Sequence, residues 1–342
     1  MAVKVATSKG CIRALREVTI MHRLGLLDSE SPFCVAVESA LMVKARMHIV
    51  MQWAEYGTLF SLLDRQTSQL PEATCKVLTW SLLSALSFCH ARGIAHLDVK
   101  AENALLIKRG EEHAAAAAAS GFAFPADAGP YVAVLCDFGE AAELSLKQHP
   151  EDDERASADM PGVPAVPLAS SASDTSAHSR QTSAQSTAHS VAEAPAFAYD
   201  AYDEPCHSHL AGSLDYVAPD VLRKSYRPRE ADMWSMGVTL FLMLSNQLPF
   251  MAATQELTEH RILNQREPLP RSVFPRVSEA AASLLLHLLR RDAAQRLSAD
   301  DALRHPWISG KGGDAPWAAA MAAIPTGLDV PFTHETSEET EV

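Results

Sequence analysis

The 342-residue sequence lacks the features of a secreted or membrane-spanning chain. Its first residues, Met1 to Thr7, contain no extended apolar segment of the kind found in secretory signals. The longest apolar run, Met236 to Leu244, is too short to cross a bilayer. The six cysteines have no paired spacing, so we expect reduced thiols rather than a disulfide framework. These absences predict a soluble intracellular protein, cytoplasmic or nuclear, with no membrane partner.

Basic residues are also in short supply. The chain has 29 Lys and Arg against 42 Asp and Glu, a net charge of −13, which argues against nucleic acid as a partner. A zinc site is not expected either, because Cys206-His-Ser-His209 has no second pair of ligands elsewhere. With 47% apolar residues, the chain has ample material for one large domain or two small ones.

What the sequence does contain is a loop rich in chemically useful groups, His96-Leu-Asp-Val-Lys-Ala-Glu-Asn103. A predicted helix that ends near His90 precedes it, and the strand-like run Ala104 to Ile107 follows it. The loop therefore lies between rigid elements. It offers a carboxylate, an ammonium group two residues later and an amide three residues beyond that.

A second polar motif, Asp137-Phe-Gly139, follows the strand-like run Tyr131 to Cys136. Together the two motifs supply a base for a hydroxyl, a cation for a phosphate and two oxygen ligands for magnesium. These groups favour phosphoryl transfer.

In this order, and followed by Ala218-Pro-Asp220 and Asp232-Met-Trp-Ser-Met-Gly237, the motifs resemble those of eukaryotic protein kinases of the Ser/Thr type. Arg296-Leu-Ser298 and His305-Pro-Trp-Ile308 are most similar to the calcium/calmodulin-dependent kinase group, although no EF-hand loop is present. The resemblance covers roughly residues 1–308.

The resemblance implies an α+β, two-lobed protein-kinase-like fold. A truncated, small β-rich N-lobe is expected at 1–53 and a large, mainly helical C-lobe at 54–308. Insertions are expected at about 108–130, exposed and without an apolar face, and at about 147–208. The second insertion has a composition typical of disorder, and a phosphoregulatory role and a neutral expansion are both open. An acidic flexible tail is expected at 309–342.

The resemblance also implies the residues of the site. Asp98 would accept the proton of the substrate hydroxyl and Lys100 would neutralise charge on the γ-phosphate, while Asn103 and Asp137 would bind Mg²⁺. The ATP-binding residues would be Lys4, Glu17, Met51, Gln52, Ala54 and Leu105. In this set Lys4 would hold the α- and β-phosphates and Glu17 would hold Lys4.

Supporting roles follow from the same resemblance. Ser213 is expected near Asp98 and Lys100, and Asp232 is expected to anchor the backbone near His96. An apolar column of Met21, Val37, His96 and Phe138 would align the lobes.

Two substitutions depart from the family. Leu97 replaces an arginine that pairs with an activation-segment phosphate, so that kind of regulation is in doubt. Asp220 replaces a glutamate, and its shorter side chain predicts a strained or water-mediated bridge to Arg296.

The most serious departure is the lack of any Gly-x-Gly-x-x-Gly sequence, the phosphate-cradling loop of kinases. One explanation is that Met1 is an internal methionine of a longer protein. The expected function is an ATP- and Mg²⁺-dependent kinase acting on Ser/Thr hydroxyls of protein substrates. The alternatives are a pseudokinase scaffold and an N-terminally truncated fragment with weak or no turnover. The last residues, Thr340-Glu-Val342, fit a PDZ-type groove, but their charge pattern favours a plain acidic tail.

Overall fold

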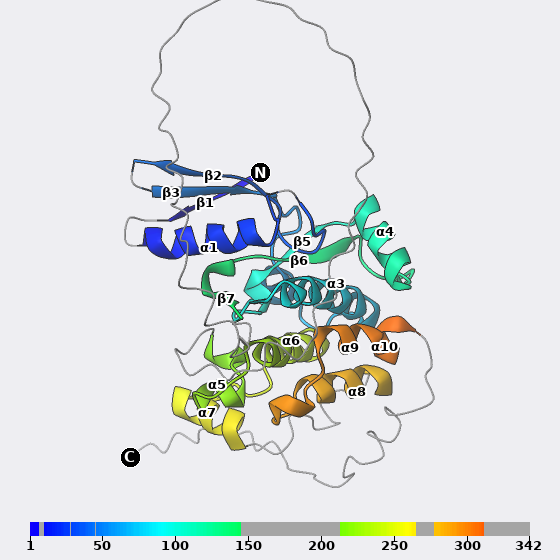
Figure 1. Ribbon diagram of the computed structural model, residues 1–342. Helices are drawn as coiled ribbons and strands as arrows, with labels where there is room; N and C mark the ends of the chain where they lie inside the picture. Colours follow the sequence, from blue (N-terminus) through cyan, green and yellow to red (C-terminus); the bar gives the residue numbers. More distant parts are fainter. Residues whose placement is uncertain (7–9, 28, 45, 145–212, 265–276, 311–342) are drawn as a thin grey trace, which may run out of the picture. The chain divides into compact units, whose positions relative to one another are not determined.

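The computed structural model describes residues 1–6, 10–27, 29–44, 46–144, 213–264 and 277–310 (Figure 1). Contacts between Cα atoms divide the chain into Met1–Ser145 with Asp203–Val342, and Leu146–Tyr202 separately. All described residues belong to the first unit. The predicted insertion at 147–208, the Cys206–His209 cluster and the tail from residue 311 onward, including the PDZ-type ending, lie outside the described residues.

The N-terminal part is a small antiparallel sheet with one helix. Its elements are β1 (Ala2–Ala6), α1 (Cys11–Arg23), β2 (Val37–Val43) and β3 (Arg46–Met51), and the strand order is β1-β3-β2. In β1 the exposure alternates, with Val3 and Val5 exposed and Ala2, Lys4 and Ala6 partly covered. This period of two is what a strand with one covered face requires. Lys4 lies on the covered face of the strand, which is the face toward α1.

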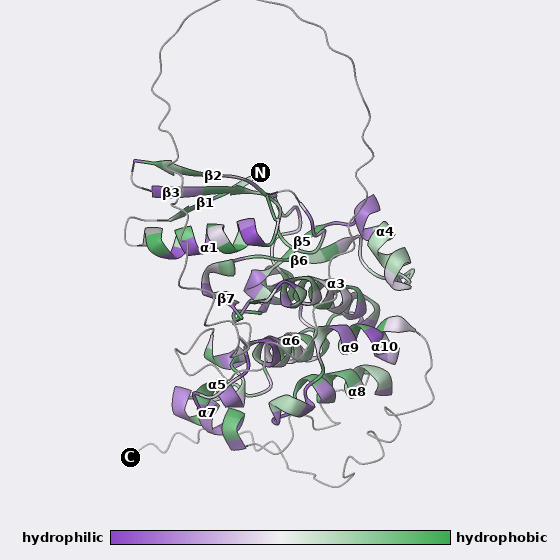
Figure 2. Ribbon diagram, viewed as in Figure 1, coloured by the Kyte–Doolittle hydropathy of each residue, from purple (hydrophilic) through white to green (hydrophobic). Residues whose placement is uncertain are grey.

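Helices dominate the rest of the described chain (Figure 1). They are α2 (Leu59–Asp64), α3 (Glu72–Ala91), α5 (Pro219–Leu222), α6 (Pro228–Ser245), α7 (Gln255–Asn264), α8 (Glu279–Leu288), α9 (Ala299–Arg304) and α10 (Pro306–Ser309). The long helices α3 and α6 are buried over most of their length, and they are largely hydrophobic in Figure 2. Helix α6 starts with Pro228, whose missing N–H costs nothing in a first turn.

Two short antiparallel strand pairs position the polar motifs. Strand β4 (Ile94–Ala95) pairs with β7 (Ala142–Glu143), and β5 (Ala104–Lys108) pairs with β6 (Tyr131–Leu135). The first motif lies between β4 and β5 and ends in a 3₁₀ turn, Ala101–Asn103. The second begins after β6 and contains a 3₁₀ turn, Phe138–Glu140. Because these strand pairs hold both ends of each motif, the two motifs come together on a rigid base.

The insertion at about 108–130 differs from its prediction, because it has a buried face. It contains helix α4 (Glu111–Ser120), which buries His113 and Ala117, and Phe122 is buried just beyond it. His113 accepts a hydrogen bond from the Gly110 amide at 3.0 Å, and its other ring nitrogen lies 3.0 Å from the carbonyl oxygen of Pro32. The expectation of a helix with nothing to bury was therefore wrong.

No helix in the described ranges combines the length and the apolar character needed to span a membrane.

Candidate active site

Asp232 of α6 holds the backbone of the first motif, His96 to Asn103, in place. Its buried carboxylate accepts hydrogen bonds from the amides of His96 and Leu97 at 2.8 and 2.7 Å. It also lies 2.8 Å from Nε2 of His90. Leu97 has a φ of 61°, a left-handed conformation that is strained for a leucine. The carboxylate therefore stabilises a turn that the sequence alone disfavours.

The turn presents Asp98, Lys100 and Asn103 together. The ammonium group of Lys100 lies 2.8 Å from Oδ2 of Asp98 and 3.0 Å from the hydroxyl of Ser213. The amide nitrogen of Asn103 donates to Oδ2 of Asp98 at 2.9 Å and to its backbone carbonyl at 2.8 Å. The Asp98 carboxylate is thus oriented from two sides. The structure brings Ser213 to the place predicted for it.

The second cluster joins β1, α1 and the Asp137 motif. The Lys4 ammonium group donates to both carboxylate oxygens of Glu17 at 2.8 and 2.9 Å and to Oδ1 of Asp137 at 2.8 Å. The Lys4 side chain is 39% exposed, whereas Glu17 is only 2% exposed. The predicted pairing of Lys4 with Glu17 is present, and its third partner, Asp137, is an addition that sequence reasoning did not make.

Burial and charge shift the pKa values of this cluster in opposite senses. Burial works against the Lys4 charge, but the hydrogen bonds that Lys4 donates to Asp137 and Glu17 outweigh it and raise the pKa of Lys4. Burial raises the pKa of Glu17, although Lys4 opposes that effect. Burial also works against the Asp137 charge, but Lys4 outweighs it and holds the pKa of Asp137 below its usual value. A cation and an ionised carboxylate therefore face each other at neutral pH.

The Asp137 motif turns sharply at its first residue. Asp137 has a φ of 60°, and its Oδ1 accepts a hydrogen bond from the amide of Gly139 at 3.3 Å. Phe138 is fully buried and packs edge-on against the His96 ring, with 4.9 Å between centroids. Burial lowers the pKa of His96, so this ring is neutral and packs as part of the core. The predicted column residues Met21, Val37, His96 and Phe138 are all buried.

The residues predicted to hold adenine lie at the end of β3 and in β5. Met51 is the last residue of β3 and is buried, and Leu105 lies in β5, half-buried, bridged to Thr58. The amide of Gln52 donates to the carbonyl of Ala36 at 2.9 Å. The backbone carbonyl of Gln52 is therefore the group of this residue that could accept a hydrogen bond from adenine. Ala54 follows on the same connection.

The donor set fits a magnesium ion. Asn103 uses its amide nitrogen on Asp98, which leaves its side-chain oxygen as a ligand. Asp137 uses Oδ1 on Lys4 and Gly139, which leaves Oδ2. Magnesium prefers oxygen ligands and usually takes only one or two carboxylates from a protein, with phosphate oxygens completing its shell. No group of three His, Cys, Asp or Glu side chains suited to a metal occurs in the described part of the chain.

Helix α1 makes further contacts with the start of the segment that follows Asp137. Arg16 donates to the carbonyl of Ala141 at 3.0 Å, Arg13 pairs with Glu140, and Arg23 lies 2.5 Å from Glu143. Sequence reasoning missed these residues and His90. The available signal was the basic side chains on one helix and the acidic ones just after Gly139.

The chain matches the protein kinase domain family over residues 1–158 and 196–308. The chain belongs to the protein kinase family. It is 30% identical to calcium-dependent protein kinase 11 of Arabidopsis thaliana over 295 residues, which are 86% of this chain and 43% of that protein. Calcium-dependent protein kinase 1 of the same plant is 26% identical over 320 residues, 93% of this chain and 39% of the relative. The chain therefore spans about two-fifths of the length of these relatives.

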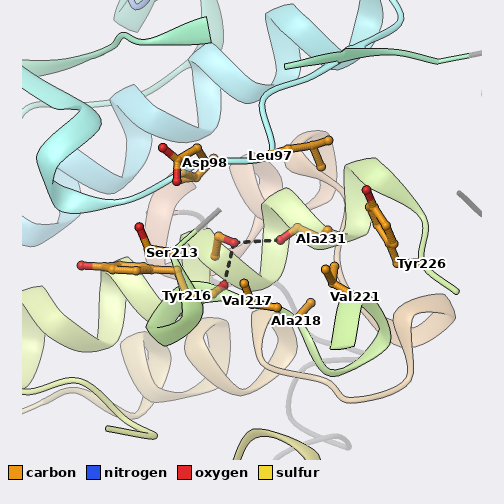
Figure 3. Close-up of a pocket in the computed structure, with 11 residues that line it drawn as sticks. Leu97, Asp98, Ser213, Tyr216, Val217, Ala218, Val221, Tyr226 and Ala231 are labelled. Carbon is orange, nitrogen blue, oxygen red and sulfur yellow. Dashed lines mark hydrogen bonds between the residues drawn. The ribbon is translucent and has the colours of Figure 1, made fainter. Parts of the chain in front are cut away.

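Leu97, the first of the two predicted departures from the kinase pattern, lines a small cavity (Figure 3). Tyr226 and Val221 lie with Leu97 around a cavity of about 10 Å³, room for no more than one water molecule. Ser235 also lines this cavity, and its hydroxyl donates hydrogen bonds to the carbonyls of Tyr216 and Ala231 at 2.8 and 3.1 Å. A leucine in this apolar setting provides no cation for a phosphate.

The second predicted departure, Asp220, was expected to make a strained or water-mediated bridge to Arg296, and the water-mediated form was wrong because the contact is direct. Asp220 Oδ1 contacts Nη2 of Arg296 directly at 2.6 Å. Arg296 also donates to the carbonyls of Glu230 and Arg290, at 2.6 and 2.8 Å. The shorter side chain instead costs a second contact, because the buried Oδ2 of Asp220 has no hydrogen-bond partner among the described residues.

Proposed function

We propose that this chain is a protein serine/threonine kinase that transfers the γ-phosphoryl group of ATP to hydroxyls of protein substrates. The observation that carries the proposal is the hydrogen-bonded set Asp98–Lys100–Asn103, with Ser213 on Lys100. An aligned carboxylate next to a cation is what in-line transfer to a hydroxyl requires.

Each side chain then has a defined task. Asp98 accepts the hydrogen bond, and later the proton, of the substrate hydroxyl. Lys100 lies beside it and offsets the negative charge that develops on the transferred group. Asn103 keeps the Asp98 carboxylate in its orientation through two hydrogen bonds.

Binding of Mg·ATP is assigned to the second cluster. Asn103 and Asp137 would hold Mg²⁺, which would neutralise phosphate charge when bound. Lys4, kept in place by Glu17, would hold the α- and β-phosphates, and Met51, Gln52, Ala54 and Leu105 would surround the adenine. A kinase without a glycine-rich loop would bind the nucleotide more weakly, because backbone N–H groups of that loop would not contact the phosphates.

The first test is thermal unfolding with and without Mg·ATP, alongside Asp137→Asn. A ligand that binds only the folded chain stabilises it by about 2.7 kcal/mol at a hundredfold excess over Kd. We expect a magnesium-dependent rise in melting temperature that the variant loses. A cooperatively unfolding chain with no such rise would contradict nucleotide binding and favour the scaffold alternative.

The second test is phosphotransfer to a mixture of Ser- and Thr-containing peptides. Asp98→Asn removes the proton acceptor and should lower kcat by about 10²- to 10⁴-fold. The nucleotide-dependent rise in melting temperature should persist in this variant, because Asp98 is not assigned to binding. Equal turnover in the wild type and the variant would rule out the assigned role.

A further inference from the structure

Two arginines in the first half of α1 contact the chain just after the Asp137 motif. The Arg13 guanidinium group forms an ion pair with Glu140, and Nη2 of Arg16 donates to the carbonyl oxygen of Ala141 at 3.0 Å. Residues three apart in a helix are neighbours on its surface, so both contacts come from one side of α1. Figure 1 shows α1 above the turn that leads into β7, in agreement with these contacts. We call the two contacts the α1 clamp.

Arg13 also lies against the backbone of the Asp137 motif itself. The amide of Gly139 donates to Oδ1 of Asp137 at 3.3 Å. A β-carbon added to Gly139 would lie 3.0 Å from Nε of Arg13 and 3.0 Å from that same Oδ1. Both distances are shorter than a favourable contact between non-bonded atoms. The glycine therefore leaves the space in which the guanidinium group packs beside the turn that orients the Asp137 carboxylate.

The position of Arg13 is unfavourable for the helix taken alone. Helix α1 starts after Gly10, and its first turn, Cys11 to Ala14, contains no acidic residue. A cation in this turn lies at the positive end of the helix dipole, where an anion would be stabilising. Glu140 supplies that anion from outside the helix. Local helix stability therefore does not account for Arg13, whereas its contact with Glu140 does.

The clamp acts about one helical turn from Glu17. Lys4 donates to both carboxylate oxygens of Glu17 and to Oδ1 of Asp137. These two acceptors belong to different elements, so their separation depends on how α1 is held against the Asp137 motif. Burial raises the pKa of Glu17, and the charges of Lys4 and, to a smaller extent, Arg13 oppose that rise. Arg13 is therefore close enough to act on the cluster electrostatically.

We propose that Arg13 and Arg16 are positioning residues of the phosphotransfer reaction. Through the α1 clamp they hold α1 against the Asp137 motif and keep Glu17 at the spacing that Lys4 bridges. The clamp makes this arrangement a property of the chain before a nucleotide arrives. This inference rests on the function proposed above, because it takes Lys4 as the residue that holds the α- and β-phosphates of ATP.

The clamp should matter for activity and hardly at all for global stability. The side chains of Arg13 and Glu140 are 60% and 35% exposed, and ion pairs this exposed contribute little to the free energy of unfolding. Geometry is more sensitive than stability, because a misplacement of about 1 Å can lower a rate by about 100-fold. A modest bias in the position of α1 is therefore enough to change how Lys4 meets the phosphates.

Steady-state kinetics of two variants is the first test. Arg13→Gln and Arg16→Gln should each lower kcat/KM for Mg·ATP by about fivefold. The KM for a peptide substrate should change by less than about twofold, because the Asp98 motif stands on Asp232 and not on α1. Melting temperatures should stay within about 2 °C of the wild type. Proportional losses in both substrates would contradict a positioning role.

Arg23→Gln is the matched control on the same helix. Arg23 lies 2.5 Å from Glu143, and the two side chains are 55% and 49% exposed, so this ion pair resembles that of Arg13. It lies, however, nearly two helical turns beyond Glu17. We expect kcat/KM for Mg·ATP to stay within about twofold of the wild type. A loss equal to that of Arg13→Gln would reduce the clamp to a general effect of the charge on α1.

A double-mutant cycle tests whether Arg13 acts through Glu140. Glu140→Gln alone should cost about as much kcat/KM as Arg13→Gln, and the double variant should lose no more than either single one. Independent effects would instead multiply to a loss of about 25-fold. That outcome would overturn the clamp.

Amide hydrogen exchange separates failure of the clamp from failure of the proposed function. Arg13→Gln should speed exchange in α1 by about fivefold and leave α3 unchanged, whether or not the chain turns over. An active wild type whose α1 exchanges equally in the variant would overturn the clamp alone. A wild type that transfers no phosphate would contradict the proposed function and, with it, the role of the clamp in the reaction, even where the exchange confirms the contact.

Discussion

The two halves of the active site are held in very different ways. The Asp98 motif stands on Asp232, which is fully buried and bonds two backbone amides. The Lys4 cluster stands on β1, an edge strand among the described strands, and the Lys4 side chain is 39% exposed. The first arrangement is part of the core, whereas the second is a partly exposed ion-pair network in which only Glu17 is buried. We infer that the half to which the chemical step is assigned is built for stability, and that the half assigned to the nucleotide is built to be completed by a ligand.

The charges of the Asp98 motif and of the Lys4 cluster also differ in how they are stabilised. The charges around Lys4 shift one another's pKa values, so each depends on its neighbours. Asp232 instead accepts hydrogen bonds from backbone amides that cannot move without unfolding the loop. Removing one charge should therefore affect stability in the first half and ligand binding in the second.

The largest effect is expected from Asp232→Ala. It leaves the amides of His96 and Leu97 and the ring of His90 without their buried acceptor. Removing one partner of such a buried set typically costs about 3–5 kcal/mol. Urea unfolding followed by circular dichroism measures this loss. A loss below about 1 kcal/mol would mean that the loop backbone is held by something other than Asp232.

Glu17→Gln should show the opposite pattern, with little change in stability and a large loss of activity. Burial already raises the pKa of Glu17, so a neutral side chain of the same shape is tolerated there, and we expect stability to change by less than about 1 kcal/mol. Lys4 would lose one charged partner and keep Asp137. We expect kcat/KM to fall by roughly 100-fold, which corresponds to about 2.7 kcal/mol. Glu38→Gln, on the exposed side of β2, is the matched control and should have neither effect.

Sequence reasoning succeeded where function depends on local spacing. The loop from His96 to Asn103 and the Asp137 motif each lie within a few residues, so their order alone indicated the chemistry. The pairing of Lys4 with Glu17 was also expected, because the strand and the helix after it resemble the kinase pair in which a helix glutamate holds a strand lysine.

It failed where the partner lies far along the chain. The run Ala114 to Ala119 offers no apolar stripe, and α4 is instead anchored by contacts of His113 with Pro32 and of Phe122 with Trp80. No local pattern contains those pairs. The direct Asp220–Arg296 contact likewise depends on how closely α5 approaches the turn after α8, which side-chain length does not predict.

A third prediction concerns His305, a buried residue of the core. Acid should lower the stability of the C-terminal helices through this residue. Burial lowers the pKa of His305 to about 4, with His287 adding a smaller effect in the same direction. An unfolded histidine has a pKa near 6.5, so below that pH the unfolded chain binds more protons and stability falls until about pH 4. The expected loss from pH 7 to pH 5 is about 2 kcal/mol.

His305→Asn isolates this effect. Asparagine can still cap α10, where His305 now accepts the Trp307 amide through its ring nitrogen at 3.2 Å. The variant should lose about 2 kcal/mol less than the wild type between pH 7 and pH 5 in urea titrations. Identical pH dependence in both proteins would assign the acid sensitivity to other groups.

The smallest effect concerns an imperfect contact in the buried half, the one between Asp220 and Arg296. Asp220 uses one oxygen on Arg296, and its other oxygen is buried without a partner among the described residues. Asp220→Glu adds a methylene of reach, which would allow both oxygens to meet the guanidinium group, and we expect a gain of about 0.5–1 kcal/mol in urea unfolding. Asp220→Asn, the matched control, keeps the length but removes the charge and should destabilise the chain. If Asp220→Glu destabilises it as well, the site around Arg296 has no room for the longer side chain, and the single contact is its best arrangement.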